Sequence, residues 1–240
     1  MFRLTPRQVV VIIPRSAAEP ALAALAHDLG AVRLDDLLLA TLRDAIAAAV
    51  RVDGATIAVV PSTAGQVADL RHLLPAGVEY AAPPEPMPDS LLARFALAAH
   101  QGRGFERIVI VDGAVLRLTS RLIATGLGSL ASADAVVGSS RHGAVWAFGL
   151  LGRHAGRFTQ SDEPLIGGDH PAADLVARLR AMRLSTRRLD PLPTLDTFST
   201  LDELRSGVPG APGSGRHLAA FLARVPATEP AMAGRNRHVQ

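Results

Sequence analysis

Apolar runs of strand length alternate with helical patterns over about the first 200 residues of this chain. Gln8 to Pro14, Ala55 to Val60 and Arg107 to Val111 are dominated by valine, isoleucine and alanine, which is typical of strands buried on both faces. Leu34 to Val50 has apolar residues at helical spacing and lies between the first two runs. This alternation predicts a three-layer α/β/α fold with a mostly parallel central sheet.

The second half of the chain continues the pattern with shorter elements. The predicted elements are strands over Asp134 to Gly138 and Val145 to Leu151, and helices over Ala172 to Met182, Thr200 to Arg205 and His217 to Arg224. Between the last two helices, the run G-V-P-G-A-P-G-S-G is typical of a linker. We therefore predict one α/β domain over residues 1–206, followed over residues 207–240 by a linker, a short helix and a disordered tail.

Composition excludes several kinds of chemistry. The chain has no cysteine, which excludes disulfides, thiol nucleophiles and cysteine-based zinc sites. The pI near 10.7 reflects a lack of groups that titrate between histidine and arginine, because the formal net charge is only +3. Aromatic residues make up 4%, and they do not interleave with basic residues, so we expect no nucleic-acid partner.

No apolar run is long enough to span a bilayer, so no membrane span is expected. Val9 to Ile13 is too short for the hydrophobic region of a signal peptide. We therefore interpret this run as the first strand and expect a cytoplasmic protein.

Polar residues follow several predicted strands. Ligands of open parallel sheets bind beyond the carboxyl ends of the strands. The residues predicted at this edge are Pro14, Arg15, Pro61, Ser62, Asp112 and Gly113, with the loop from Ser139 to Gly143 and Asp196 within reach. Neither G-x-G-x-x-G nor G-K-[ST] follows the first strand, which argues against a classical dinucleotide-binding protein or a P-loop NTPase.

Three segments together resemble a bacterial group of the nucleotide-diphospho-sugar transferase superfamily. They are the strand that ends in Asp112, A-D-A-V-V-G-S-S-R-H-G-A-V-W-A-F-G-L (133–150) and P-L-P-T-L-D-T-F-S-T-L-D-E-L (191–204). In that group, the domain of unknown function 2064, the corresponding segments typically read D-S-P-D-L-P, D-V-V-L-G-P-A-x-D-G-G-Y-x-L-x-G-L and L-P-P-L-x-D-x-D-T-P-x-D-L. The resemblance covers about Gln8 to Arg205, and it implies a GT-A fold and transfer from a nucleotide-sugar.

This sequence differs from the family pattern at several of the polar positions. Asp112 matches the first aspartate of the family, but Val115 stands in place of the second. The run His142-Gly143-Ala144 replaces Asp-Gly-Gly, whereas Asp196-Thr197 keeps the last Asp-Thr. The basic segment that follows the first strand in the family is S-A-A-E-P-A-L-A-A-L here, which leaves only Arg15.

These departures bear on how a leaving diphosphate would be stabilised. The usual device is a Mg²⁺ or Mn²⁺ ion held by carboxylates, and the resemblance assigns that role to Asp112. Arginines can instead bind a diphosphate directly; Arg15, Arg117 and Arg141 are the candidates, and His142 could add a hydrogen bond or a charge. The resulting assignment gives catalysis to Asp112 and His142, any metal to Asp112, and nucleotide or diphosphate binding to Pro14, Arg15, Ser62, Gly113, Arg141 and Asp196.

Three functions stay open at this point. The first is a glycosyltransferase-like protein that uses a nucleotide-sugar, with weak or arginine-assisted metal use. The second is a catalytically degenerate relative that acts as a binding module. The third is a nucleotidyltransferase of cofactor synthesis, although the glycine-rich, lysine-containing loop of those enzymes is absent. A pocket where Asp112, Arg141, His142 and Asp196 converge would favour an enzyme, whereas Val115 packed into that place would favour the second function.

Overall fold

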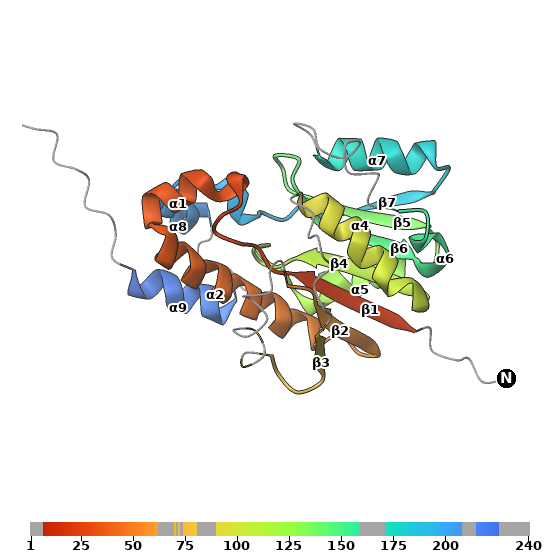
Figure 1. Ribbon diagram of the computed structural model, residues 1–240, viewed down its shortest axis with the longest axis horizontal. Helices are drawn as coiled ribbons and strands as arrows, with labels where there is room; N and C mark the ends of the chain where they lie inside the picture. Colours follow the sequence, from red (N-terminus) through yellow and green to blue (C-terminus); the bar gives the residue numbers. More distant parts are fainter. Residues whose placement is uncertain are drawn as a thin grey trace, which may run out of the picture.

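The computed structural model describes residues 7–61, 70, 72, 74–80, 90–158, 171–207 and 215–225. The strands of this part of the chain are β1 (Gln8–Ile13), β2 (Ala55–Val59), β3 (Val78–Tyr80), β4 (Arg107–Asp112), β5 (Ala135–Ser139), β6 (Val145–Leu151) and β7 (Thr186–Leu189). They form one sheet in the order β3-β2-β1-β4-β6-β5-β7 (Figure 1).

Most neighbouring strands of the sheet run parallel. β1 pairs in parallel with both β2 and β4, β2 pairs in parallel with β3, and β5 pairs in parallel with β7. Only β6 is antiparallel to its two neighbours, β4 and β5. The predicted mostly parallel sheet is therefore confirmed, and the carboxyl ends of β1, β2 and β4 lie along one edge.

Helices cover both faces of the sheet and one end of the molecule. They are α1 (Ala23–Leu29), α2 (Ala31–Ala49), α4 (Leu91–Gln101), α5 (Ser120–Ser129), α6 (Gly152–Ala155), α7 (Pro171–Ala181), α8 (Leu201–Gly207) and α9 (Arg216–Arg224), with 3-10 turns η1 (Pro20–Leu22), η2 (Gly102–Gly104) and η4 (Leu195–Thr197). In the described part of the chain, no helix combines the length and the apolar character that crossing a membrane would require.

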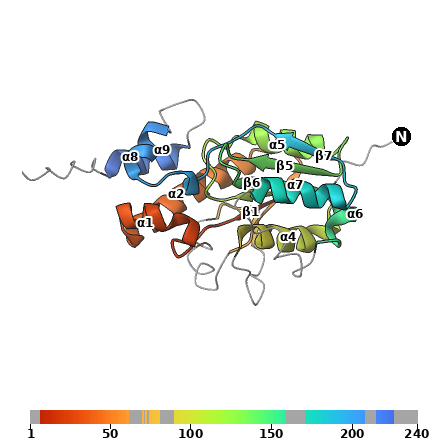
Figure 2. The same ribbon diagram turned by 90° about the horizontal axis from the view of Figure 1, so that it is seen from above.

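The continuous apolar strands have a simple cause. Val9, Val11 and Ile13 of β1 pack in one hydrophobic cluster with α4 and α7, whereas Val10 and Ile12 pack in a second cluster with α2 and α5. Figure 2 shows α4 and α5 on opposite sides of the sheet. Because alternate residues of a strand point to opposite faces, a strand in the middle layer needs apolar residues at every position.

A third hydrophobic cluster lies beyond the sheet. It joins α1, α8 and α9 to the first half of α2, and these helices gather at one end of the molecule (Figure 1). Leu218 and Phe221 of α9 are 2% and 3% exposed in this cluster. The predicted helix from His217 to Arg224 is therefore present as α9, and it packs on α2.

Candidate functional site

The carboxyl ends of β1 and β4 are closely packed side by side. Ile13 pairs with Asp112 in the parallel register, and the backbone N–H of Gly113 donates to the carbonyl oxygen of Ile13 at 2.8 Å. A Cβ atom on Gly113 would lie 2.9 Å from that oxygen and 3.2 Å from Cα of Pro14. Gly113 is therefore required for this approach of the two strand ends.

Asp112 is fully buried at this edge, and the protein engages both of its carboxylate oxygens. Oδ2 accepts a hydrogen bond from Nη1 of Arg15 at 3.0 Å, and Oδ1 accepts one from the backbone N–H of Ala114 at 2.9 Å. Burial raises the pKa of Asp112 to about 6, although the Arg15 guanidinium and the Ala114 N–H both act to lower it. A metal ion that used this carboxylate would share its oxygens with Arg15 and the Ala114 N–H.

The guanidinium of Arg15 lies among three carboxylates. Besides Asp112, it forms an ion pair with Glu19 through Nε, and its Nη1 lies 3.6 Å from Oδ2 of Asp196. Burial acts to lower the pKa of Arg15, but the three neighbouring carboxylates raise it above its ordinary value. Arg15 therefore supplies a permanent positive charge beside both Asp112 and Asp196.

Arg94 completes this group, which we call the Arg15 cluster: Arg15, Glu19, Arg94, Asp112 and Asp196. Arg94 of α4 is 6% exposed, and its Nη1 donates to Oε1 of Glu19 at 2.9 Å. When ionised, the three carboxylates and two guanidiniums carry a net charge of −1, which adds to the cost of a charge on Asp112. The cluster holds the segment after β1 against α4.

The sequence did not lead us to predict Glu19 and Arg94 as site residues, although the position of each contains an indication. Glu19 follows Arg15 by four residues, which is ion-pairing distance on a helical turn. Arg94 stands between the buried residues Ala93 and Phe95 on a helix. An arginine at such a position needs a buried partner, but the sequence does not reveal which carboxylate supplies it.

Asp196 reaches the cluster through an irregular pairing of two loops. Two backbone hydrogen bonds, of 2.9 and 3.1 Å, and one bridge join residues 193–195 to residues 114–116. Thr194 is fully buried, and its hydroxyl donates to Oδ1 of Asp196. This pairing brings a residue from the end of the fold to the carboxyl edge of β4.

The position of the second aspartate of the family belongs to the hydrophobic core. Val115 is 3% exposed and packs in the cluster between the sheet and α2, and Leu116 is 1% exposed and packs with α1 and α8. Neither side chain offers a ligand to a metal ion or a phosphate. In the described part of the chain, no three histidine or carboxylate side chains are grouped so that they could hold a metal ion.

Arg141 and His142 lie on the turn between β5 and β6. The hydroxyl of Ser140 fixes this turn by accepting from the backbone N–H of His142 at 3.2 Å and of Ala144 at 3.1 Å. Both predicted side chains are exposed. Beside them is a cavity of about 410 Å³, lined by Val137, Ser139, Ser140, Arg141, His142, Gly143, Ala172, Ala173, Val176 and Arg188.

The predicted site residues thus fall into two groups. Arg15, Asp112 and Asp196 form one buried cluster, with Pro14 and Gly113 at its base, whereas Arg141 and His142 line a separate cavity that no member of the Arg15 cluster lines. Arg117 is exposed, with a left-handed φ of 63°. Ser62 lies outside the described residues.

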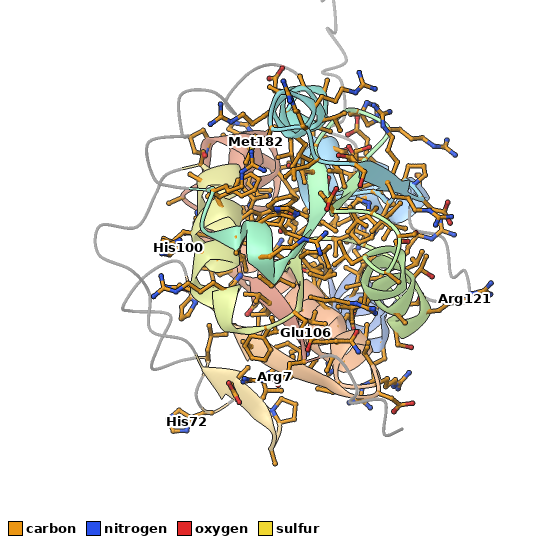
Figure 3. The ribbon with its side chains drawn as sticks, turned by 90° about the vertical axis from the view of Figure 1, so that its right-hand side faces the viewer. Arg7, His72, His100, Glu106, Arg121 and Met182 are labelled. Atoms are coloured by element: carbon orange, nitrogen blue, oxygen red, sulfur yellow. The ribbon has the colours of Figure 1, made fainter. Side chains whose placement is uncertain are left out.

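The opposite edge of the sheet, where β1 and β4 begin, has a second cavity and a separate group of polar side chains (Figure 3). Arg7 and Glu106 lie there, before β1 and β4, and a cavity of about 710 Å³ opens beside Glu106. Asp134 lines it and accepts hydrogen bonds from Ser185, Arg153 and His154 at 2.7 to 3.0 Å. The Ser185 hydroxyl is the main cause of a lowered pKa of Asp134. These bonds tie the start of β5 to α6 and to the residue before β7.

Comparison with known proteins defines the fold. No family model matches the sequence, and no curated protein matches it, so membership of the domain of unknown function 2064 stays a prediction. A proposed nucleotide-diphospho-sugar transferase from Desulfovibrio desulfuricans G20 superposes with a TM-score of 0.70 and 16% identity, over 91% of this chain and 98% of that chain. This chain therefore has the GT-A-like fold of the nucleotide-diphospho-sugar transferases.

More distant structures share the fold. A homologue of Mycobacterium tuberculosis Rv0371c from Mycobacterium sp. strain JC1 has a TM-score of 0.55 at 16% identity, over 92% of this chain and 99% of its own. The 4-diphosphocytidyl-2C-methyl-D-erythritol synthase of Anaerococcus prevotii has a TM-score of 0.52 at 9% identity, over 83% and 93%. Rv0371c itself has been solved with manganese, and a CMP-2-keto-3-deoxy-manno-octonic acid synthetase with CTP, each with a TM-score of 0.50.

Proposed function

We propose that this protein is a glycosyltransferase-like transferase that binds a nucleotide-sugar at the carboxyl edge of its sheet without a bridging divalent cation. The observation that carries the proposal is the buried ion pair of 3.0 Å between Arg15 and Asp112. The carboxylate that would hold the metal ion in this fold already has a cation. Arg15 compensates part of the negative charge of Asp112 and Asp196, which reduces the electrostatic attraction of this site for a divalent cation.

The diphosphate then needs another source of positive charge, and the turn between β5 and β6 supports one. The cavity beside this turn is lined by Arg141, His142 and Arg188, and no acidic residue lines it. Guanidinium groups bind phosphate oxygens in pairs through their planar N–H donors. We assign diphosphate binding to these three side chains, which extends the predicted role of Arg141 and His142 to Arg188.

The first experiment measures the thermal shift caused by UDP-, GDP-, ADP- and dTDP-sugars, each with Mn²⁺ and with EDTA. A ligand that binds only the folded state raises the melting temperature by mass action. We expect at least one nucleotide-sugar to raise it equally in both conditions. A shift that appears only with Mn²⁺ would contradict the proposal.

Two variants make the test specific to the assigned residues. Arg141→Ala and Arg188→Ala should each weaken binding about 10- to 100-fold, because each removes a charged hydrogen-bond donor to a phosphate. Arg121→Ala, an exposed arginine on α5, is the matched control and should bind normally. Arg15→Met frees Asp112 and Asp196, and this variant should acquire a melting-temperature shift with Mn²⁺ alone.

A non-catalytic binding module is the second candidate, and one observation favours it. Val115, which stands in place of the second aspartate of the resembled family, is 3% exposed, and the neighbouring Leu116 is 1% exposed. If bound nucleotide-sugar releases no nucleoside diphosphate in the presence or absence of acceptors, the binding module is the better description. Release of pyrophosphate from a nucleoside triphosphate would instead favour a nucleotidyltransferase of cofactor synthesis.

A further inference from the structure

A cationic surface lies far along the chain from the residues discussed above, where α9 packs against α2. Two cavities, of about 690 and 520 Å³, flank α9 and share Arg43 and His217 in their walls. We call this region the α2–α9 surface and define it by Val32, Arg33, Arg43, Val50, Arg51, Arg216 and Arg224. Figures 1 and 2 both show α9 beside α2, at the end of the molecule away from β7.

The lining of the two cavities is cationic. Five arginines line them against two aspartates, Asp36 and Asp44, which gives the lining a formal charge of +3. Asp44 is also engaged, because its carboxylate accepts from the backbone N–H groups of His217 and Leu218.

The arginines of the surface have no acidic partner among the residues that the structure describes. Within the residues that the structure describes, none of the five forms an ion pair with a carboxylate. Arg33, Arg51, Arg216 and Arg224 are exposed. A group of like charges without counterions is favourable only in water or against an anionic partner.

The same surface carries the large hydrophobic side chains that are exposed in the described part of the chain. These are Val32, 77% exposed, and Val50, 46% exposed. Val50 is the helical C-cap of α2, so the two valines are 18 residues apart, about five turns and about 27 Å, on one face of the helix. Each precedes an arginine of the surface, Arg33 or Arg51.

We propose that the α2–α9 surface binds the face of an anionic lipid bilayer, so that the protein is a peripheral membrane protein. Exposed valines next to exposed arginines suit this partner, because the valines can enter the interface while the arginines contact lipid phosphates. A soluble polyanion would explain the arginines but not the exposed valines. The proposal does not depend on the nucleotide-sugar function, because it involves none of the same residues.

The test is co-sedimentation of the full chain with phosphatidylcholine vesicles that contain or lack phosphatidylglycerol. We expect binding only to the anionic vesicles, and a loss of binding as ionic strength rises. Arg33→Gln/Arg51→Gln should lower the partition coefficient about 25-fold, about fivefold per charge removed. Val32→Ser/Val50→Ser, which keeps every charge, should also bind measurably less than wild type.

The matched control is Arg121→Gln/Arg187→Gln, which removes two exposed arginines from other elements and should bind like wild type. Thermal melting of all variants shows whether they are folded, and their unchanged response to a nucleotide-sugar separates this proposal from the preceding one. Equal loss of binding in the control pair would overturn the proposal. Binding to soluble polyphosphate without binding to anionic vesicles would also overturn it, in favour of a soluble polyanion.

Discussion

Asp112 carries its charge in a place that water does not reach. It is 0% exposed, and its compensation comes from Arg15 and one backbone N–H. Burial nevertheless dominates, and it raises the pKa of Asp112 from 3.8 to about 6. Because a raised carboxyl pKa means that the folded protein prefers the neutral form, ionisation of Asp112 works against folding.

The raised pKa of Asp112 predicts that the free energy of unfolding of the protein depends on pH. Between pH 4 and 6, the folded state holds a proton on Asp112 that the unfolded state has released. The contribution of Asp112 is therefore greatest below its unfolded pKa, and it is lost as the pH rises through about 6. Relative to Asp112→Asn, the free energy of unfolding of the wild type should fall by about 2–3 kcal/mol from about pH 4 to pH 7.

Urea denaturation of both proteins across this range measures the difference. The asparagine variant is the right reference, because its amide keeps an acceptor for the Ala114 N–H and does not ionise. A difference in unfolding free energy that stays constant from pH 4 to 7 would show that Asp112 does not titrate in this range.

At the scale of the element, α9 is held at both ends by side chains from other helices. The carboxylate of Asp44 on α2 accepts from the backbone N–H groups of His217 and Leu218, at 3.1 and 2.9 Å. At the other end, Arg205 of α8 donates to the carbonyl oxygen of Leu222 at 3.3 Å and to that of Val225. Asp44 therefore supplies the N-terminal cap that the sequence of α9 lacks.

Removing this cap should destabilise the protein. Asp44→Ala leaves two backbone N–H groups without their acceptor, and we expect a loss of about 1–2 kcal/mol in the free energy of unfolding. Asp53→Ala, at an exposed aspartate in the loop before β2, is the control and should change stability little. If the two variants lose the same stability by urea denaturation, Asp44 is not the cap of α9 in solution.

At the scale of the whole molecule, the boundary predicted at residue 206 divides two helices that share one hydrophobic cluster. Leu204 of α8 and Phe221 of α9 both belong to the cluster around α1 and α2. We propose that α9 is an integral part of the α/β domain, although a glycine- and proline-rich segment precedes it. The composition of residues 207–215 predicts a linker but carries no information about where the following helix packs.

Truncation tests this proposal. A chain that ends at Gly207 loses the buried side chains Leu218 and Phe221, and it should lose about 3–6 kcal/mol of stability. A chain that ends at Val225 keeps α9 with its partners and is the control. If both truncated chains unfold at the same urea concentration as the full chain, α9 does not contribute to the stability of the domain.

Most of the fold was predictable because strands and helices are indicated by hydrophobic periodicity, which depends only on residues close together in the chain. The strands β1, β2, β4, β5 and β6 and the helices α2, α7 and α9 were expected within a few residues of their bounds. The segment after β1 was not expected to be helical, because we treated it only as the missing basic segment of the family. It forms η1 and α1, and this short helix depends on burying Leu22, Leu25 and Leu29 in the third cluster.

The sequence predicted that the site lies at the carboxyl edge of the sheet, but not which side chains contact one another there. Position after a strand was enough to place Pro14, Arg15, Asp112 and Gly113 together, because parallel strands share one carboxyl edge. The chemistry of that edge depends on partners that are remote in the chain. Arg15 and Asp112 are 97 residues apart, and Glu19 and Arg94 are 75 apart.

The sequence by itself determined which segments form strands and helices and which polar residues stand at the ends of the strands, because these depend on hydrophobic periodicity within a few residues. Only the tertiary structure decided that Asp112 is paired with an arginine, that Val115 is core and that α9 packs on α2. Burial and ion pairing depend on which distant side chains share a volume from which water is excluded, and no local pattern encodes that.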